Sequence, residues 1–164
     1  MNDFTDFMLE RDDVAVASVN NVVIVVWKKT PTAESAGLIG PLYKRVSDRS
    51  RDGIGLLVVI AEGVSVPNDK VRKLATEAMN EVRKTLRASA AVITTTGLLG
   101  ATTRAVLSTM LLLAPSEGES RVFAGTDEAI EWLGGKLVPP GSAVSSFESV
   151  MKTTARQLHP TARR

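Results

Sequence analysis

The 164-residue sequence contains no cysteine and a single histidine, His159. The lack of cysteine excludes disulfide bonds, thiolate nucleophiles and thiolate metal ligands. With one imidazole, a zinc, copper or iron site would lack its usual ligands, so we expect no metal and no cofactor. A catalytic serine triad would depend on His159, and no Gly-x-Ser-x-Gly motif occurs. These absences predict a protein that is not an enzyme.

The sequence also has little that points to a membrane or to nucleic acid. Its longest apolar-rich stretch, residues 105–114, is shorter than the roughly 20 residues that cross a bilayer, and the N-terminus lacks the features of a secretory signal. Basic and acidic residues number 20 and 18, which leaves a net charge of +2 without a strongly basic stripe. We therefore expect a cytoplasmic protein with no membrane insertion and no nucleic-acid partner.

Three apolar segments without polar alternation predict strands buried on both faces of a sheet: residues 22–27, 54–61 and 90–96. Residues 14–19 precede the first segment, and the intervening Asn20-Asn21 pair tolerates the positive φ of a tight hairpin turn. Residues 120–124 predict a last strand. Helical periodicity between these strands requires crossover connections. The predicted fold class is α/β, with a mixed, mainly parallel sheet, an N-terminal antiparallel hairpin and helices packed around it.

Capping residues and glycines predict where the helices begin and end. Thr30 is expected to cap the first helix, and Gly134-Gly135 is expected to end the helix that Thr126 caps. The other helices are expected at residues 69–88, 98–114 and 143–158. Composition predicts three parts: an acidic N-terminal arm (1–13), an α/β domain (14–137), and a Pro-Gly linker with a basic C-terminal helix and tail (138–164).

Two segments resemble the STAS or SpoIIAA-like domain family of bacteria. One is Arg121-Val122-Phe123 followed by Glu128-Ala129-Ile130-Glu131-Trp132-Leu133, and the other begins with Gly97-Leu98-Leu99-Gly100. The resemblance covers residues 14–134 and implies a SpoIIAA-like fold. In anti-sigma-factor antagonists of this family, a partner kinase phosphorylates a serine at the start of the second helix. Here Asn68, Asp69 and Lys70 occupy that stretch and Ser65 lies upstream, so the expected phosphoacceptor is missing.

Seven residues form a candidate surface for regulation, for a partner or for a ligand. They lie where the second and third buried strands end and the next helices begin: Glu62, Ser65, Asn68, Asp69, Gly97, Gly100 and Arg104. Functional groups of α/β proteins gather at such carboxyl ends, and a glycine-rich helix start can bind an anion that Arg104 would support. The alternatives are helix capping by Asn68 or Asp69 and a tight glycine turn. Trp27 and Tyr43 fit either a ligand pocket or the core.

Three classes of function follow from these features. The leading one is a non-catalytic regulatory or scaffolding module that contacts another protein, as the resemblance implies; the partner's identity stays open. The second is a small-ligand sensor in which a nucleotide, a lipid or another metabolite occupies a crevice near Glu62, Asn68 and Gly97. The third is an enzyme that uses carboxylates, but no second titratable group is identifiable near Glu62.

The helix expected at residues 98–114 is apolar around most of its circumference, so its outer side needs a cover. Met110, Leu111 and Leu112 are the candidates for the covered surface. The cover is expected to be a second copy of the chain, which would make a homodimer, or the C-terminal segment 143–158 with Phe147 and Met151.

Overall fold

A computed structural model describes residues 5–113, 118–137 and 144–159, and the side chains of 106–113 and 144–146 lie outside the described part. The elements follow one another along the chain in this order: β1 (Thr5–Glu10), β2 (Val14–Val19), β3 (Val22–Trp27), α1 (Ala33–Gly37), α2 (Ile39–Asp48), β4 (Ile54–Ile60), α3 (Asp69–Glu81), β5 (Leu86–Ile93), α4 (Gly97–Leu113), β6 (Glu119–Phe123), α5 (Thr126–Leu137) and α6 (Val144–Leu158).

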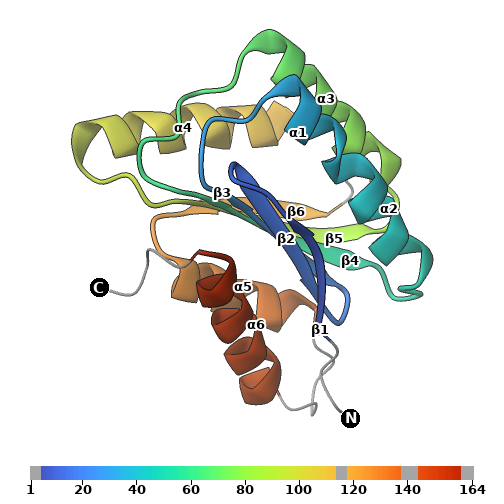
Figure 1. Cartoon of the computed structure of the whole chain (residues 1–164). Coiled ribbons are helices and arrows are strands. Elements are labelled where there is room, and N and C mark those ends of the chain that lie inside the picture. Colours follow the sequence, from blue (N-terminus) through green and yellow to red (C-terminus); the bar gives the residue numbers. More distant parts are fainter. Residues whose placement is uncertain (1–4, 114–117, 138–143, 160–164) are drawn as a thin grey trace.

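The strands form one six-stranded sheet in which the spatial order equals the chain order. β1, β2 and β3 pair antiparallel, whereas β3, β4, β5 and β6 pair parallel. Figure 1 shows α1 to α4 on one side of the sheet and α5 and α6 on the other. The predicted α/β architecture with a mixed sheet and an N-terminal hairpin is confirmed, as is the interior position of β3, β4 and β5. Among the described helices, none combines the length and the apolar character that a membrane span requires.

The hairpin forms where the sequence predicts it, because Asn20 adopts a positive φ of 51° between β2 and β3. The acidic segment before it contains β1, an edge strand of the sheet. Asp6 of β1 pairs with Arg45 of α2 at 2.8 Å and with Arg49, the residue that follows α2, at 3.7 Å. Glu10 accepts a hydrogen bond from Lys28 at 2.9 Å. Opposite charges therefore attach residues 5–10 to the domain that they were expected to precede.

Asp13 follows β1 and lies near the start of α1. Burial opposes its ionisation, but hydrogen bonds from the Ser35 side chain and from backbone N–H, together with the Arg11 guanidinium, lower the pKa of Asp13 overall. Ser35 also forms a capping box with Thr32, so the first helix begins after Thr32 and the predicted cap at Thr30 is wrong. Thr30 and Thr32 lie on either side of Pro31. Only Thr32 is followed three residues later by a side chain, that of Ser35, which accepts a hydrogen bond from the backbone N–H of the capping threonine.

The helix expected at 69–88 ends at Glu81, and β5 begins at Leu86 rather than at residue 90. Leu86 lies four residues after Val82, so it continues the apolar helical pattern, but it is buried beside Ile54 in the β4–β5 pairing. The expected end at Gly134-Gly135 is also wrong, because α5 continues to Leu137. A Cβ on Gly134 would lie 2.8 Å from the Glu148 carboxylate of α6, so a larger residue here would displace that side chain.

Each face of the sheet has its own apolar cluster, because successive side chains of a strand point to opposite faces. Ile24, Leu57, Ile130, Leu133 and Met151 belong to the cluster beneath α5 and α6. The cluster beneath α1, α2 and α3 is different: Val23, Val25, Leu56, Ile39 and Tyr43 are members of it. This second face also contains the cavity described next.

Candidate functional site

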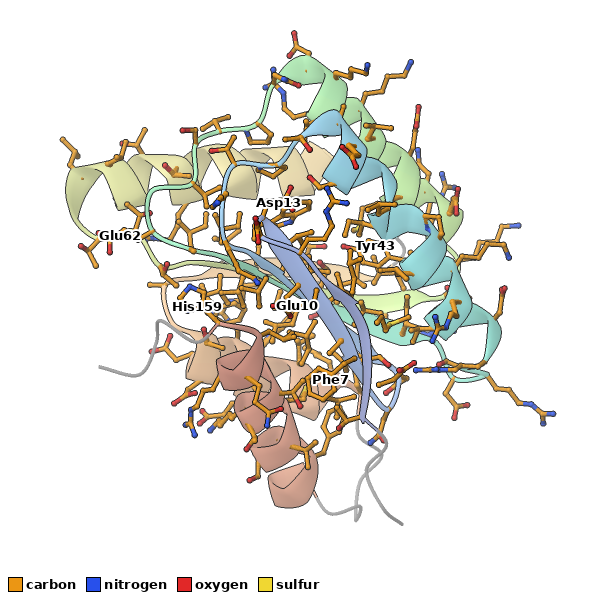
Figure 2. The ribbon with its side chains drawn as sticks, in the orientation of Figure 1. Phe7, Glu10, Asp13, Tyr43, Glu62 and His159 are labelled. Carbon is orange, nitrogen blue, oxygen red and sulfur yellow. The ribbon has the colours of Figure 1, made fainter. Side chains whose placement is uncertain are left out.

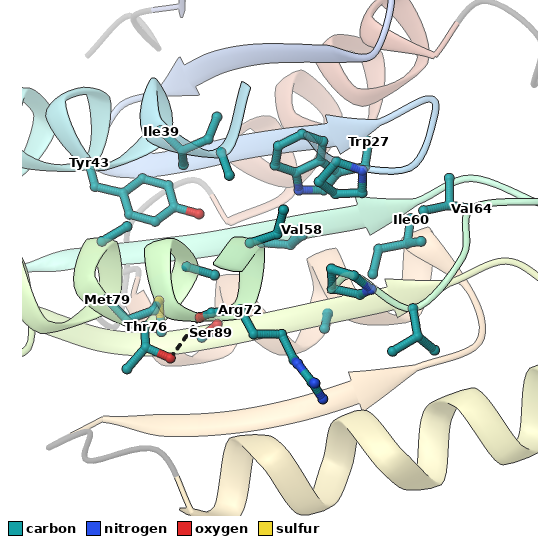
Figure 3. A pocket seen from close by; sticks show the side chains of 18 of the residues that line it. Trp27, Ile39, Tyr43, Val58, Ile60, Val64, Arg72, Thr76, Met79 and Ser89 are labelled. Carbon is teal, nitrogen blue, oxygen red and sulfur yellow. Dashed lines mark hydrogen bonds between the residues drawn. The ribbon is translucent and has the colours of Figure 1, made fainter. Parts of the chain in front are cut away.

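A cavity of 260 Å³ lies beneath α3, on the side of the sheet that carries α1 to α4 (Figure 3). We call it the α3 cavity. Strand residues form its floor and the α1–α3 layer forms its roof, while the loop after β4 and Thr103 of α4 complete the wall: the lining includes Trp27, Val58, Ile60, Ser89, Ala91, Ser120, Ala36, Ile39, Tyr43, Val64, Ser65, Val66, Arg72, Ala75, Thr76, Ala78, Met79 and Thr103.

Small side chains are the reason for this space. On the side of the sheet that faces α3, β5 and β6 carry the small residues Ser89, Ala91 and Ser120. The other two parallel strands, β3 and β4, carry the larger residues Trp27 and Val58 on this side. The roof residues Ala36, Ala75 and Ala78 are also small, so helix and sheet leave a gap between them. Protein interiors are otherwise close-packed, and a gap of this size is larger than the 150 Å³ cavity that admits benzene.

Two buried residues of the wall carry hydroxyl groups that have no partner in the described protein. Tyr43 is 6% exposed, its ring lies at one end of the α3 cavity and its hydroxyl points into the space (Figure 3). Ser89 is 4% exposed and forms part of the floor. Among the described residues, no hydrogen bond reaches the side-chain oxygen of either residue. No fully buried side-chain oxygen of the described residues lacks a partner, so these two oxygens open onto the α3 cavity and leave hydrogen-bonding capacity directed into it.

Burial alone sets the ionisation of Tyr43. It raises the pKa of the phenol far above its ordinary value of 10.0, so the group is a neutral hydrogen-bond donor and acceptor. The two threonine hydroxyls of the lining differ from it, because Thr76 donates to the Arg72 carbonyl oxygen at 3.0 Å and Thr103 donates to the Leu99 carbonyl oxygen at 2.9 Å. Tyr43 and Ser89 are therefore the buried hydroxyl groups that a bound molecule would meet, and Ser65, Ser120 and Asn80 add less buried polar groups to the lining.

Arg72 is the one charged residue in the described lining, and it pairs with Asp69 one turn earlier on α3. The Arg72 side chain is 41% exposed and that of Asp69 is 93% exposed, so this ion pair lies in contact with water at the edge of the α3 cavity. Figure 3 shows the guanidinium extending away from Tyr43, toward the side where β6 and α4 lie.

The candidates on the loop before α3 separate into two groups. Ser65 lines the α3 cavity, and its backbone N–H donates to the Thr30 hydroxyl at 3.0 Å, which connects this loop to the one after β3. Asn68 caps α3 by accepting a hydrogen bond from Val71 N–H at 3.0 Å, as the capping alternative predicts. Glu62 is exposed and lies away from the α3 layer (Figure 2), so it does not share a site with these residues.

The glycine-rich start of α4 uses its polar groups within the turn. Arg104 donates to the carbonyl oxygens of Ile93 at 3.3 Å and Thr95 at 3.0 Å. Gly97 has a positive φ of 73°, and a side chain on the buried Gly100 would collide with the Thr95 carbonyl group. These contacts match the tight-turn alternative. The Arg104 guanidinium is hydrogen-bonded to backbone carbonyl groups at the end of β5 and just after it.

The surface expected on α4 is described only in part. Met110, Leu111 and Leu112 lie in the α4 backbone, but their side chains lie outside the described residues. Phe147 and Met151 are buried on α6, which packs with α5 on the opposite face of the sheet (Figure 1). The C-terminal segment therefore does not cover α4, and that alternative is wrong. The homodimer stays a prediction.

Sequence reasoning found part of this site. It named Ser65, and it weighed Trp27 and Tyr43 as pocket residues, but it missed Arg72 and Ser89. Across the described residues, no group of three histidines or carboxylates is placed to hold a metal ion. Comparisons of the chain with protein-family models, with curated proteins and with solved structures give no match.

Proposed function

We propose that the protein is a non-catalytic regulatory module whose input is a small, mainly apolar ligand bound in the α3 cavity. The observation that carries this proposal is the unpartnered Tyr43 hydroxyl, 6% exposed and directed into a space of 260 Å³. Ligand sites are concave and mostly apolar, with a few polar groups that fix orientation. A ligand with an apolar body and one neutral oxygen would fill the space and pair with Tyr43 or Ser89.

The proposal assigns the site a binding role without a chemical step. Its described lining offers hydroxyl groups, the Asn80 amide and one guanidinium, which can position a ligand. General acid–base chemistry needs two titratable groups with opposed roles, and the carboxylate considered from the sequence, Glu62, is exposed and does not line the α3 cavity.

Thermal unfolding in the presence of octanol tests the proposal. Octanol supplies an apolar chain and one neutral oxygen, and a ligand of the native state stabilises it by about 2.7 kcal/mol at one hundred times its Kd. We expect a rise in Tm for the wild type and a much smaller rise for Ala91→Leu, which fills the floor of the α3 cavity. Ala101→Leu, on an exposed position of α4, is the matched control and keeps the full response. Equal responses of all three proteins, or none, would contradict the proposal.

A second candidate function is contact with another protein. Leu98 and Leu99 are 86% and 71% exposed in the first turn of α4, and adjacent exposed leucines are typical of interaction surfaces. The double variant Leu98→Lys, Leu99→Lys is expected to lose a stoichiometric partner that the wild type retains. Leu38→Lys, at an apolar position that is 38% exposed on another part of the α1–α3 layer, is the control. Equal retention by both variants would exclude this surface.

The STAS-like assignment also stands as a proposal. The succession of an antiparallel hairpin, then helices alternating with parallel strands, is the feature that supports it. The phosphoacceptor position does not support it, because asparagine and aspartate carry no hydroxyl group to phosphorylate. Asn68 is the cap of α3, and Asp69 forms an ion pair with Arg72. We therefore propose regulation by a bound ligand rather than by phosphorylation at this helix start.

A further inference from the structure

The charge in the described lining of the α3 cavity is positive, and it comes from Arg72 alone. Apart from Arg72, the lining consists of apolar side chains, hydroxyl side chains and the amide of Asn80, and no described carboxylate is part of it. Cationic ligands would therefore bury their charge beside a guanidinium, which is costly. An anionic group at the edge of the α3 cavity would instead meet a cation that is already in place.

Arg72 can exchange its present partner for a ligand. Both members of the Arg72–Asp69 pair are in contact with water, so the pair is held weakly. An ion pair between Arg72 and a ligand would be more shielded, because the ligand's own apolar body would cover one side of it. The planar fork of an arginine side chain also matches the two oxygens of a carboxylate.

The volume limits the apolar body. A cavity of 150 Å³ accommodates the six carbons of benzene, so a volume of 260 Å³ has room for about eight to ten carbon atoms. The single guanidinium matches a single negative charge, and the nearby Asp69 carboxylate opposes a second one.

Building on the proposed function, we infer that the ligand is a medium-chain monocarboxylic acid. Its hydrocarbon chain lies in the α3 cavity against Trp27, Val58 and Ile60, and its carboxylate lies at the edge, paired with Arg72. Neutral oxygen groups along the chain would face Tyr43 and Ser89. Asp69 is released to water when the acid binds.

Calorimetric titration at neutral pH with octanoate, octanol and octylamine tests this inference, because the three probes share a chain and differ in head group. We expect octanoate to bind the wild type about ten- to a hundredfold more tightly than octanol, the range for a charge-assisted hydrogen bond. Octylamine should bind least. Arg72→Met should reduce the affinity for octanoate to that for octanol and leave octanol unchanged.

Two further variants keep the test decisive. Lys73→Met removes one positive charge from the same helix at an exposed position outside the described lining, and it should leave octanoate binding unchanged. Arg72→Lys keeps the charge without the fork and should retain part of the preference for octanoate, which also provides a folded variant if Arg72→Met is unstable. Equal affinity for octanol and octanoate, or tightest binding of octylamine, would overturn the inference and leave the proposed function standing. Failure of every probe to bind would overturn both.

Discussion

Replacing Tyr43 by phenylalanine should not destabilise the ligand-free protein. The substitution removes one oxygen from a residue that is 6% exposed and leaves the ring packing intact. A buried polar group without a partner costs about 1–3 kcal/mol, and this cost is an upper limit here because the hydroxyl opens onto the α3 cavity. We therefore expect the free energy of unfolding to stay the same or to rise by up to about 1 kcal/mol.

Ser35→Ala is the matched control, because it removes a buried hydroxyl that has protein partners. The Ser35 hydroxyl lies 3.0 Å from the Thr32 N–H and accepts its hydrogen bond, and the Thr32 hydroxyl accepts from Ser35 N–H at 3.2 Å. Loss of this capping box should cost about 1 kcal/mol. Urea denaturation at neutral pH measures both variants. A loss of 1 kcal/mol or more in Tyr43→Phe, equal to that in Ser35→Ala, would refute the unpartnered hydroxyl.

The same pair of proteins predicts a difference at alkaline pH. Burial raises the pKa of Tyr43 in the folded state above the ordinary 10.0 that it has when unfolded. Above that pH the unfolded chain loses the phenolic proton first, so the wild type loses up to about 1.4 kcal/mol of stability per pH unit through this group. Tyr43→Phe lacks this loss, and its advantage over the wild type should grow as the pH rises.

Three other predictions concern stability. Met151→Ala should destabilise the protein by about 2–5 kcal/mol in urea denaturation, because Met151 is fully buried where α6 meets the sheet; a loss below 1 kcal/mol would show that α6 is not docked there. Gly135→Ala should stabilise α5 by up to about 1 kcal/mol, whereas Gly134→Ala should gain less because the Glu148 side chain must move; equal gains in Tm would contradict the contact between Gly134 and Glu148. Asp13→Asn should reduce stability at neutral pH, because the pKa of Asp13 is lower in the folded state than in the unfolded chain. The difference from the wild type should vanish as the pH falls through the ordinary pKa of 3.8 and below, and a difference that stays constant with pH would contradict this.

The interior of the sheet could be predicted from the sequence because its signal is local. Unbroken apolar runs such as residues 22–27 and 54–61 leave no polar face for water, so strands buried on both sides are their natural interpretation. The boundaries that failed are those where two patterns coincide. Leu86 fits a helical spacing from Val82 and also a strand register with Ile54, and the pairing in the sheet decides between them.

The parts of the site that were missed depend on contacts between distant segments. Ser89 lies in an apolar strand and Arg72 on an amphipathic helix, and neither position is unusual in its own surroundings. The α3 cavity exists because small residues from β5, β6, α1 and α3 face one another across one gap. A local sequence pattern does not predict which distant segments will face one another. Gly134 is a similar case, since glycine near a helix end predicts a cap, but here it lies within α5 against the Glu148 side chain of α6.

The position of the α3 cavity connects ligand binding to a part of the surface. Its lining joins α3, through Arg72, with α4, through Thr103, and these two helices lie on the same side of the sheet (Figure 1). A ligand that contacts both would favour arrangements in which they are held together, because it stabilises only the conformations that it binds. The exposed Leu98 and Leu99 lie in the first turn of α4, within a helical turn or two of Thr103. The proposed ligand would thus act on the helix that carries the proposed protein contact, which is how one small domain can combine a sensor with a regulatory surface.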